Sequence, residues 1–149
     1  MIRATAICLA IAALTVTGTA PKKRLLESIT VSPAMAKGAK AAYVATGKFN
    51  EPPVKVEPLH VSWYLAGPGI DPPPPYYALT GDKDKPDRCN EIAANPVEFH
   101  YTVIALAPAD PKASTSGNVP YKVFHDLVID HSKTSEGGFV AGFAKLACP

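Results

Sequence analysis

The sequence predicts an all-β fold, an antiparallel β-sandwich of about seven strands, and three observations support this prediction. Short runs in which apolar and polar residues alternate recur along the chain, which is typical of antiparallel strands with one buried face. Turn-forming residues separate these runs, and the 149 residues include 10 glycines and 16 prolines. The chain is also long enough to form one domain with a core of its own.

The first half of the chain contains three alternating runs. In residues 28–32, Ile29 and Val31 point to one face, and Pro33 ends the strand or confines it to a sheet edge because it has no backbone donor. The inward-facing residues of the next two runs are Ala41, Tyr43, Ala45, Gly47 and Phe49, followed by Leu59, Val61, Trp63 and Leu65. We expect Trp63 to pack between the two sheets.

The second half adds two clear strands and one ambiguous segment. Residues 98–106 carry apolar side chains on both faces toward their end, so we expect a central strand there. Residues 121–129, YKVFHDLVI, fit a strand and the apolar face of a helix equally well, and we interpret them as a strand. Residues 139–148 alternate again and predict the last strand. The predicted core comprises Ile29, Val31, Tyr43, Ala45, Val61, Trp63, Tyr101, Val103, Ala144 and Leu146.

Short motifs on these strands are shared with a known family. They are Val31-Ser32-Pro33-Ala34, Ala45-Thr46-Gly47-Lys48-Phe49 and Val61-Ser62-Trp63, with the closing GFAKLACP in addition. Through them the chain resembles bacterial immunoglobulin-like domains of the group 2 type, as in exported acidobacterial surface proteins. The resemblance implies an immunoglobulin-like sandwich that serves as a structural or binding module of surface, adhesive or polysaccharide-associated proteins. It offers no catalytic residues to carry over.

Residues 1–20 are predicted to be a secretory signal peptide. Arg3 precedes a run of apolar and small residues, Ala4 to Val16, that is too short for a transmembrane helix, which needs about 20 residues. An uncleaved N-terminal anchor and a buried strand are the alternatives. After cleavage, residues 21–25 would form a flexible N-terminus and residues 26–149 the immunoglobulin-like domain, with no stable membrane span.

The charge balance argues against a nucleic acid as partner. Arg3 is the only one of the 15 basic residues within residues 1–20, and none of the 13 acidic residues lies there, so cleavage lowers the formal net charge from +2 to +1. We interpret the cluster Lys22-Lys23-Arg24 as a solvated terminus rather than a binding patch. The expected partner is an unknown protein or polysaccharide at the cell surface.

Cys89 and Cys148 are the only cysteines outside the predicted signal peptide. In a small exported domain an even pair of cysteines predicts a disulfide bond, which here would tie the middle of the chain to its last strand. Two free thiols are one alternative. A metal pair is another, but it would need further ligands at short spacing.

Two loop segments have structural interpretations. Residues 72–77, PPPPYY, form either a stiff spacer or a docking tip, and we favour the spacer. Residues 81–87 contain three carboxylates, the ligand type of calcium sites, but the interleaved lysines and Pro86 favour a solvated turn.

The four histidines offer two candidate chemistries. His60 and His100 lie on outward faces of predicted neighbouring strands and could together hold a transition metal, although two imidazoles make a weak site. His125 and Asp126 resemble a general base with its orienting acid. A hydrolase would also need a nucleophile, and the serines at 114, 116, 132 and 135 lie in polar loops without a nucleophile-elbow motif.

These observations predict a non-catalytic exported immunoglobulin-like module with a structural or binding role at the cell surface or in the periplasm. We expect no catalytic, cofactor-binding or metal-binding residues, and no cofactor. The alternatives are a small secreted hydrolase that uses His125 and Asp126, and a histidine-based metal-binding protein.

Overall fold

The computed structural model describes residues 18, 20–34, 42–68, 92–98, 100–113 and 119–146. Most of the predicted signal peptide, the segment 69–91 and the three cysteines at positions 8, 89 and 148 lie outside these residues. The predictions of signal cleavage, of the Cys89–Cys148 disulfide, of the proline-rich spacer and of the acidic turn therefore stay predictions.

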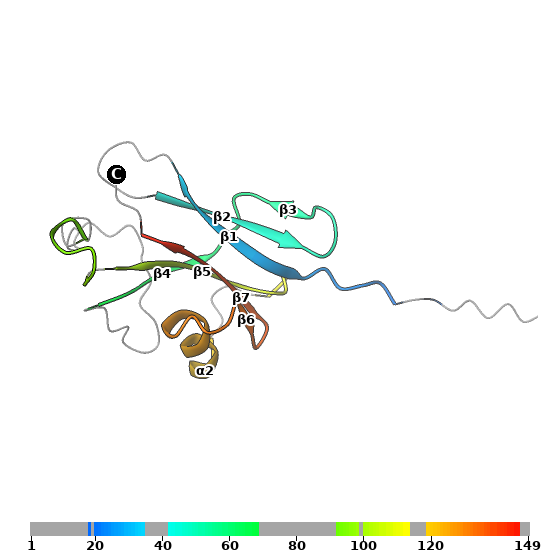
Figure 1. Cartoon of the computed structure of the whole chain (residues 1–149). Coiled ribbons are helices and arrows are strands. Elements are labelled where there is room, and N and C mark those ends of the chain that lie inside the picture. The colour runs from blue at the N-terminus through cyan, green and yellow to red at the C-terminus, as the bar shows by residue number, and fades with distance from the viewer. Residues whose placement is uncertain are drawn as a thin grey trace, which may run out of the picture.

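Two antiparallel sheets form the body of the protein (Figure 1). The first sheet has the order β1-β2-β3, and its strands are β1 (Leu26–Ala34), β2 (Ala42–Phe49) and β3 (Lys55–Val56). The second has the order β4-β5-β7-β6, and its strands are β4 (Ser62–Ala66), β5 (Thr102–Pro108), β6 (Ser135–Glu136) and β7 (Phe139–Lys145). The all-β sandwich that the sequence predicts is confirmed.

Two strand positions follow the prediction closely. β1 lies at the edge of its sheet, where Pro33 can be accommodated without a missing ladder bond. β5 lies between β4 and β7, as expected for a strand with apolar residues on both faces.

The first core fills the space between the two sheets. All ten residues of the predicted core belong to it, six of them buried and Tyr43, Val61, Trp63 and Ala144 partly buried. The backbones of the two sheets lie close together where β1 meets β7. A Cβ atom added to Gly142 would lie 2.5 Å from the carbonyl oxygen of Ile29, so a side chain at Gly142 has no room.

The segment 121–129 is helical, so its interpretation as a strand is wrong. It forms α2 (Tyr121–Phe124), which continues as the π-helix η1 (His125–Ile129). Figure 1 shows this helix on the face of the second sheet opposite the first sheet. The apolar residues permit either period, and the helix is the form that places Val123, Phe124, Leu127 and Val128 together against the sheet.

A second core joins the helix to the outer face of the second sheet. The sheet contributes Tyr64, Ile104, Leu106 and Ala141, and the helical segment contributes Val119, Val123, Phe124, Leu127 and Val128. The rings of Tyr64 and Phe124 meet edge to face, with their centroids 5.2 Å apart. The protein therefore has three layers, and its second sheet is buried on both faces.

The strands β5 and β7 pair along their full length, from Thr102 with Lys145 to Pro108 with Phe139. The backbone N–H of Ala109 then donates to the carbonyl of Gly138 at 2.8 Å. The helix and β6 thus lie in the segment that connects β5 to β7, residues 109–138. The two ends of this segment are adjacent because β5 and β7 are paired.

The segment before β1, expected as part of a flexible terminus, makes several contacts with the first sheet. The Arg24 guanidinium lies 3.7 Å from the centroid of the Phe49 ring and donates to the carbonyl oxygen of Pro53 at 2.9 Å. Asn50 accepts from the N–H of Leu25 at 2.7 Å and donates to the carbonyl of Lys23 at 3.0 Å. Among the residues that the structure describes, no helix is long and apolar enough to cross a membrane.

Candidate functional site

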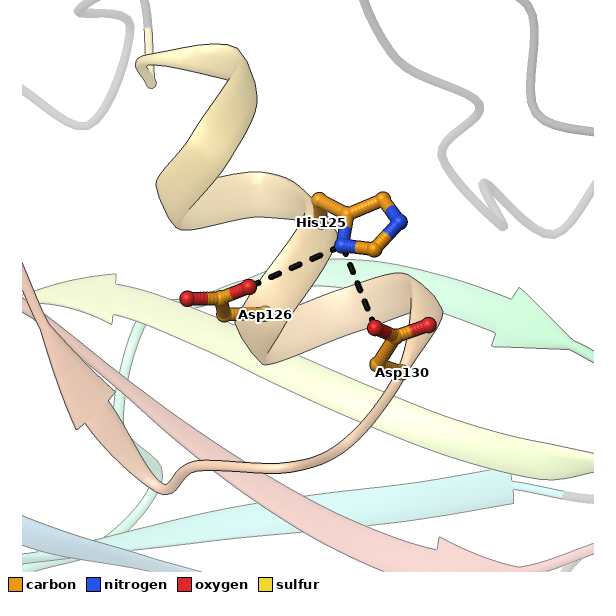
Figure 2. A group of neighbouring side chains, drawn as sticks. All are labelled: His125, Asp126 and Asp130. Carbon is orange, nitrogen blue, oxygen red and sulfur yellow. Dashed lines mark ion pairs between the residues drawn. The ribbon is translucent and has the colours of Figure 1, made fainter.

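The outward surface of the helix carries a group of three ionisable side chains, His125, Asp126 and Asp130 (Figure 2). His125 Nδ1 lies 3.2 Å from Asp130 Oδ2 and 3.6 Å from Asp126 Oδ1. The imidazole nitrogen therefore stands between two carboxylates. We call these three residues the His125 cluster.

The helical geometry explains why residues five apart meet here. The N–H of Asp130 donates to the carbonyl of His125 at 2.8 Å, which is the i to i+5 hydrogen bond of a π-helix. This wider turn places Asp130 next to His125 along the helix axis. In a regular α-helix, position i+4 would take that place.

The second oxygen of Asp126 belongs to an ion network with Lys122, Lys133 and Glu136. Asp126 Oδ2 accepts from Lys122 Nζ at 3.0 Å and from Lys133 Nζ at 3.2 Å. Both ammonium groups also donate to Glu136 Oε1, at 3.1 Å and 2.9 Å respectively. Because Glu136 lies in β6, this ion network ties the helix to the strand pair β6–β7.

The ion network favours the charged forms of Asp126, Lys122 and Lys133. The network that Asp126 shares with Glu136, together with the hydrogen bonds that Asp126 accepts from Lys122 and Lys133, holds the pKa of the Asp126 carboxyl far below its ordinary value. The pKa of Lys122 is raised chiefly by Asp126, and that of Lys133 chiefly by Glu136. Asp126 is therefore a carboxylate throughout the neutral and mildly acidic range.

We expect Asp126→Asn to weaken the acid sensitivity of folding. A carboxyl whose pKa is lowered by folding stabilises the folded state above its unfolded pKa, about 3.9, and loses that contribution as the pH falls toward the folded pKa. The free energy of unfolding of the wild type should thus fall below about pH 4, and more steeply than that of Asp126→Asn. Urea unfolding at a series of pH values from 7 to 2 measures both slopes.

Glu57→Gln is the control for that measurement, because Glu57 is exposed and has no ion pair among the described contacts. It should reproduce the wild-type slope. An Asp126→Asn protein with the same slope as Glu57→Gln would show that the ion network does not contribute to acid sensitivity.

The structure brings together only part of the predicted hydrolase arrangement. His125 and Asp126 do lie side by side. The Ser132 hydroxyl donates to the backbone carbonyl of Asp126 at 3.3 Å, and Ser135 is an exposed residue of β6. Ser114 and Ser116 lie outside the described residues. The described serines are thus not hydrogen-bonded to His125.

The predicted pairing of His60 with His100 is wrong. β4 and β5 run antiparallel, with Ser62 opposite Leu106 and Ala66 opposite Thr102. His60 precedes β4 and His100 precedes β5, so the two residues lie beyond opposite ends of this strand pair. They line two different hollows of the protein.

The larger of these hollows is a pocket of about 380 Å³ between the helix and the end of the second sheet. Its wall consists of Tyr64, Leu65, Ala66, Gly67, His100, Thr102, Phe124, Val128, Ile129 and His131. Most of this wall is apolar, and its polar side chains are those of Tyr64, Thr102 and the two histidines. We call it the helix–sheet pocket.

His131 is the unusual residue of this pocket. It follows the helix with a positive φ of 52°, and its ring centroid lies 5.2 Å from that of Phe143. Its Nε2 atom is buried and has no hydrogen-bond partner in the described part of the chain. A buried polar atom without a partner is costly, and a ligand that hydrogen-bonds to it would remove that cost.

Sequence reasoning missed this pocket because one of its walls is the helix that was interpreted as a strand. The fit of residues 121–129 to a helical period was the one feature of the sequence that could have indicated the helix.

Comparison with known proteins adds nothing to this picture, since no family model, no curated protein and no solved structure matches the chain. Its fold defines the class: a two-sheet antiparallel β-sandwich with a helix on one outer face.

Proposed function

We propose that this protein is a non-catalytic, exported immunoglobulin-like module that binds a protein or polysaccharide at the cell surface or in the periplasm. The observation that carries this proposal is the helix–sheet pocket. Binding sites are concave and mostly apolar, with a few polar groups that orient the ligand. The pocket has this composition, and His100, Thr102 and His131 are among its polar groups.

The size of the pocket indicates what it receives. About 380 Å³ is near the lower end of the range for small-molecule sites, about 300–1,000 Å³. A volume of this kind suits one protruding group of a larger partner, such as a single sugar ring or side chain. The Nε2 atom of His131, which has no hydrogen-bond partner among the described residues, would then hydrogen-bond to the polar end of that group.

The ion network supports a binding role over the hydrolase alternative. An orienting acid in a hydrolase holds the histidine in position for catalysis. Here Asp126 interacts with Lys122 and Lys133 at shorter distances than with His125, and these contacts join the helix to β6. This arrangement favours a structural role for Asp126, in keeping with a rigid binding scaffold.

The proposal predicts that a larger side chain inside the helix–sheet pocket lowers the affinity of the protein for its ligands. The full chain is expressed in a bacterium and recovered from the periplasmic fraction. Its intact mass should lack about 20 residues, and two thiols should appear only after reduction, as expected for export with a Cys89–Cys148 disulfide. A library of monosaccharides, oligosaccharides and amphipathic peptides is then screened by ligand-observed NMR.

Ala66→Leu is the decisive variant, because Ala66 lines the pocket and a larger side chain occupies it. We expect ligands of the wild type to lose at least ten-fold in affinity. Ala113→Leu is the matched control, since Ala113 is exposed and lines the smaller hollow of about 190 Å³ beside His60. Ligands that bind Ala66→Leu as well as the wild type would refute the pocket as the binding site. Turnover of any screened compound that His125→Ala abolishes would refute the non-catalytic proposal.

A further inference from the structure

We propose that the His125 cluster is a binding site for a single zinc-like divalent transition-metal ion, with His125 Nδ1, Asp126 Oδ1 and Asp130 Oδ2 as its ligands. The site lies on the outer surface of the helix, and none of its three residues lines the helix–sheet pocket. It therefore goes beyond the proposed binding function.

The distances fit the coordination sphere of zinc. With zinc–nitrogen and zinc–oxygen bonds of about 2.0–2.2 Å, two ligand atoms of a tetrahedral zinc ion lie about 3.3–3.6 Å apart. The imidazole nitrogen lies 3.2 Å from Asp130 Oδ2 and 3.6 Å from Asp126 Oδ1, and the three ligand atoms all lie within 4.8 Å of one another. Small rotations of the exposed Asp130 side chain can bring all three atoms within reach of one ion.

The donor set selects the class of metal. A neutral imidazole nitrogen is a ligand for zinc, copper, nickel and iron, whereas magnesium and calcium prefer sites made only of oxygen atoms. Three protein ligands leave a fourth position for water or for a group of a partner molecule. The exposure of His125 and Asp130, 38% and 52% of their side chains, leaves that position open.

The ion network has two opposite effects on a cation in this site. It holds Asp126 as an ionised carboxylate and fixes its second oxygen, so that Oδ1 faces His125. Hydrogen-bonded carboxylate ligands of this kind are common around metals. The two ammonium groups also repel a cation, but Asp126, Asp130 and Glu136 outnumber them. With a neutral imidazole the five charged groups sum to one negative charge, so the site attracts a divalent ion.

The test is a calorimetric titration of the untagged full chain with Zn²⁺ at pH 7.5. The thiols are alkylated first, so that cysteines cannot bind the metal. We expect one equivalent to bind, and Co²⁺ in its place to give the visible absorption of a four-coordinate ion. Mg²⁺ in large excess should not displace it. The absence of Zn²⁺ binding, or displacement by Mg²⁺, would overturn the proposal.

Asp130→Asn and His125→Ala identify the ligands, and each should lower the affinity for Zn²⁺ at least ten-fold. Asp130 is half exposed, so its replacement leaves the core intact and tests the site even if His125→Ala proves unstable. Asp110→Asn is the matched control, because Asp110 is also a carboxylate paired with a lysine, Lys23 at 2.9 Å, and lies away from the cluster. Unchanged affinity in Asp130→Asn, or an equal loss in Asp110→Asn, would show that the His125 cluster does not hold the metal.

Discussion

Leu127→Ala is expected to lower the free energy of unfolding by about 2–5 kcal/mol. Leu127 is fully buried at 0% exposure, in the core between the helix and the second sheet. Removing its side chain leaves a cavity that rigid neighbours such as Ile104 cannot fill without moving. Urea unfolding followed by circular dichroism measures the loss as a shift in midpoint at constant slope.

Tyr121→Ala is the control for this prediction, because Tyr121 lies on the same helix with 66% of its surface exposed. Its replacement should change the free energy of unfolding by less than about 0.5 kcal/mol. If both variants unfolded at the same urea concentration as the wild type, the helix would not be packed on the sheet as described.

Gly142→Ala is expected to destabilise the protein by about 1–3 kcal/mol or more, although it adds only a methyl group. That group would lie 2.5 Å from the Ile29 carbonyl oxygen and 2.9 Å from its carbonyl carbon. These are backbone atoms of β1, so relief requires one sheet to move away from the other. The reduced entropy of the unfolded chain favours alanine by about 0.4–1 kcal/mol, which is smaller than the expected cost of the clash.

Lys145→Ala, at an exposed position of the same strand, should leave the midpoint of urea unfolding nearly unchanged. Gly142→Val should be more destabilising than Gly142→Ala, because the added volume meets the same backbone. A Gly142→Ala protein as stable as the wild type would mean that β1 and β7 do not cross at the observed distance.

Period-two alternation of apolar and polar residues was sufficient to predict which side chains are buried in a strand that has only one face against a core. In β1, the side chains that alternation assigns to the inside, Ile29 and Val31, are buried, and their neighbours Ser28, Thr30 and Ser32 are exposed. The same rule could not resolve residues 121–129, because Val123 and Leu127 satisfy both periods. What decides between them is tertiary: the apolar outer face of the second sheet, with Ile104 and Leu106, requires a covering element.

The candidate site was only half visible in the sequence. His125 and Asp126 are adjacent in the chain, so their contact needs no knowledge of the fold. Asp130 lies next to them because residues 125–129 form a π-helix, and the pattern of apolar residues does not predict a π-helix. Glu136 contributes to the ion network only because β6 folds back beside the helix. Contacts that depend on a local change of helical period, or on a distant strand, lie beyond what residue spacing can predict.

The hydrogen bond between Ala109 and Gly138 brings together the two ends of the segment that connects β5 to β7, so this segment can be exchanged for another sequence in evolution. β5 and β7 would remain a continuous hairpin if residues 109–138 were exchanged for another segment with the same two ends, provided that it covered Ile104 and Leu106. The His125 cluster and one wall of the helix–sheet pocket belong to this segment, while the segment contributes only its end residue Ala109 to the described first core. The His125 cluster and this wall of the pocket can therefore be exchanged together with the short edge strand β6, while the pairing of β4, β5 and β7 in the second sheet is kept.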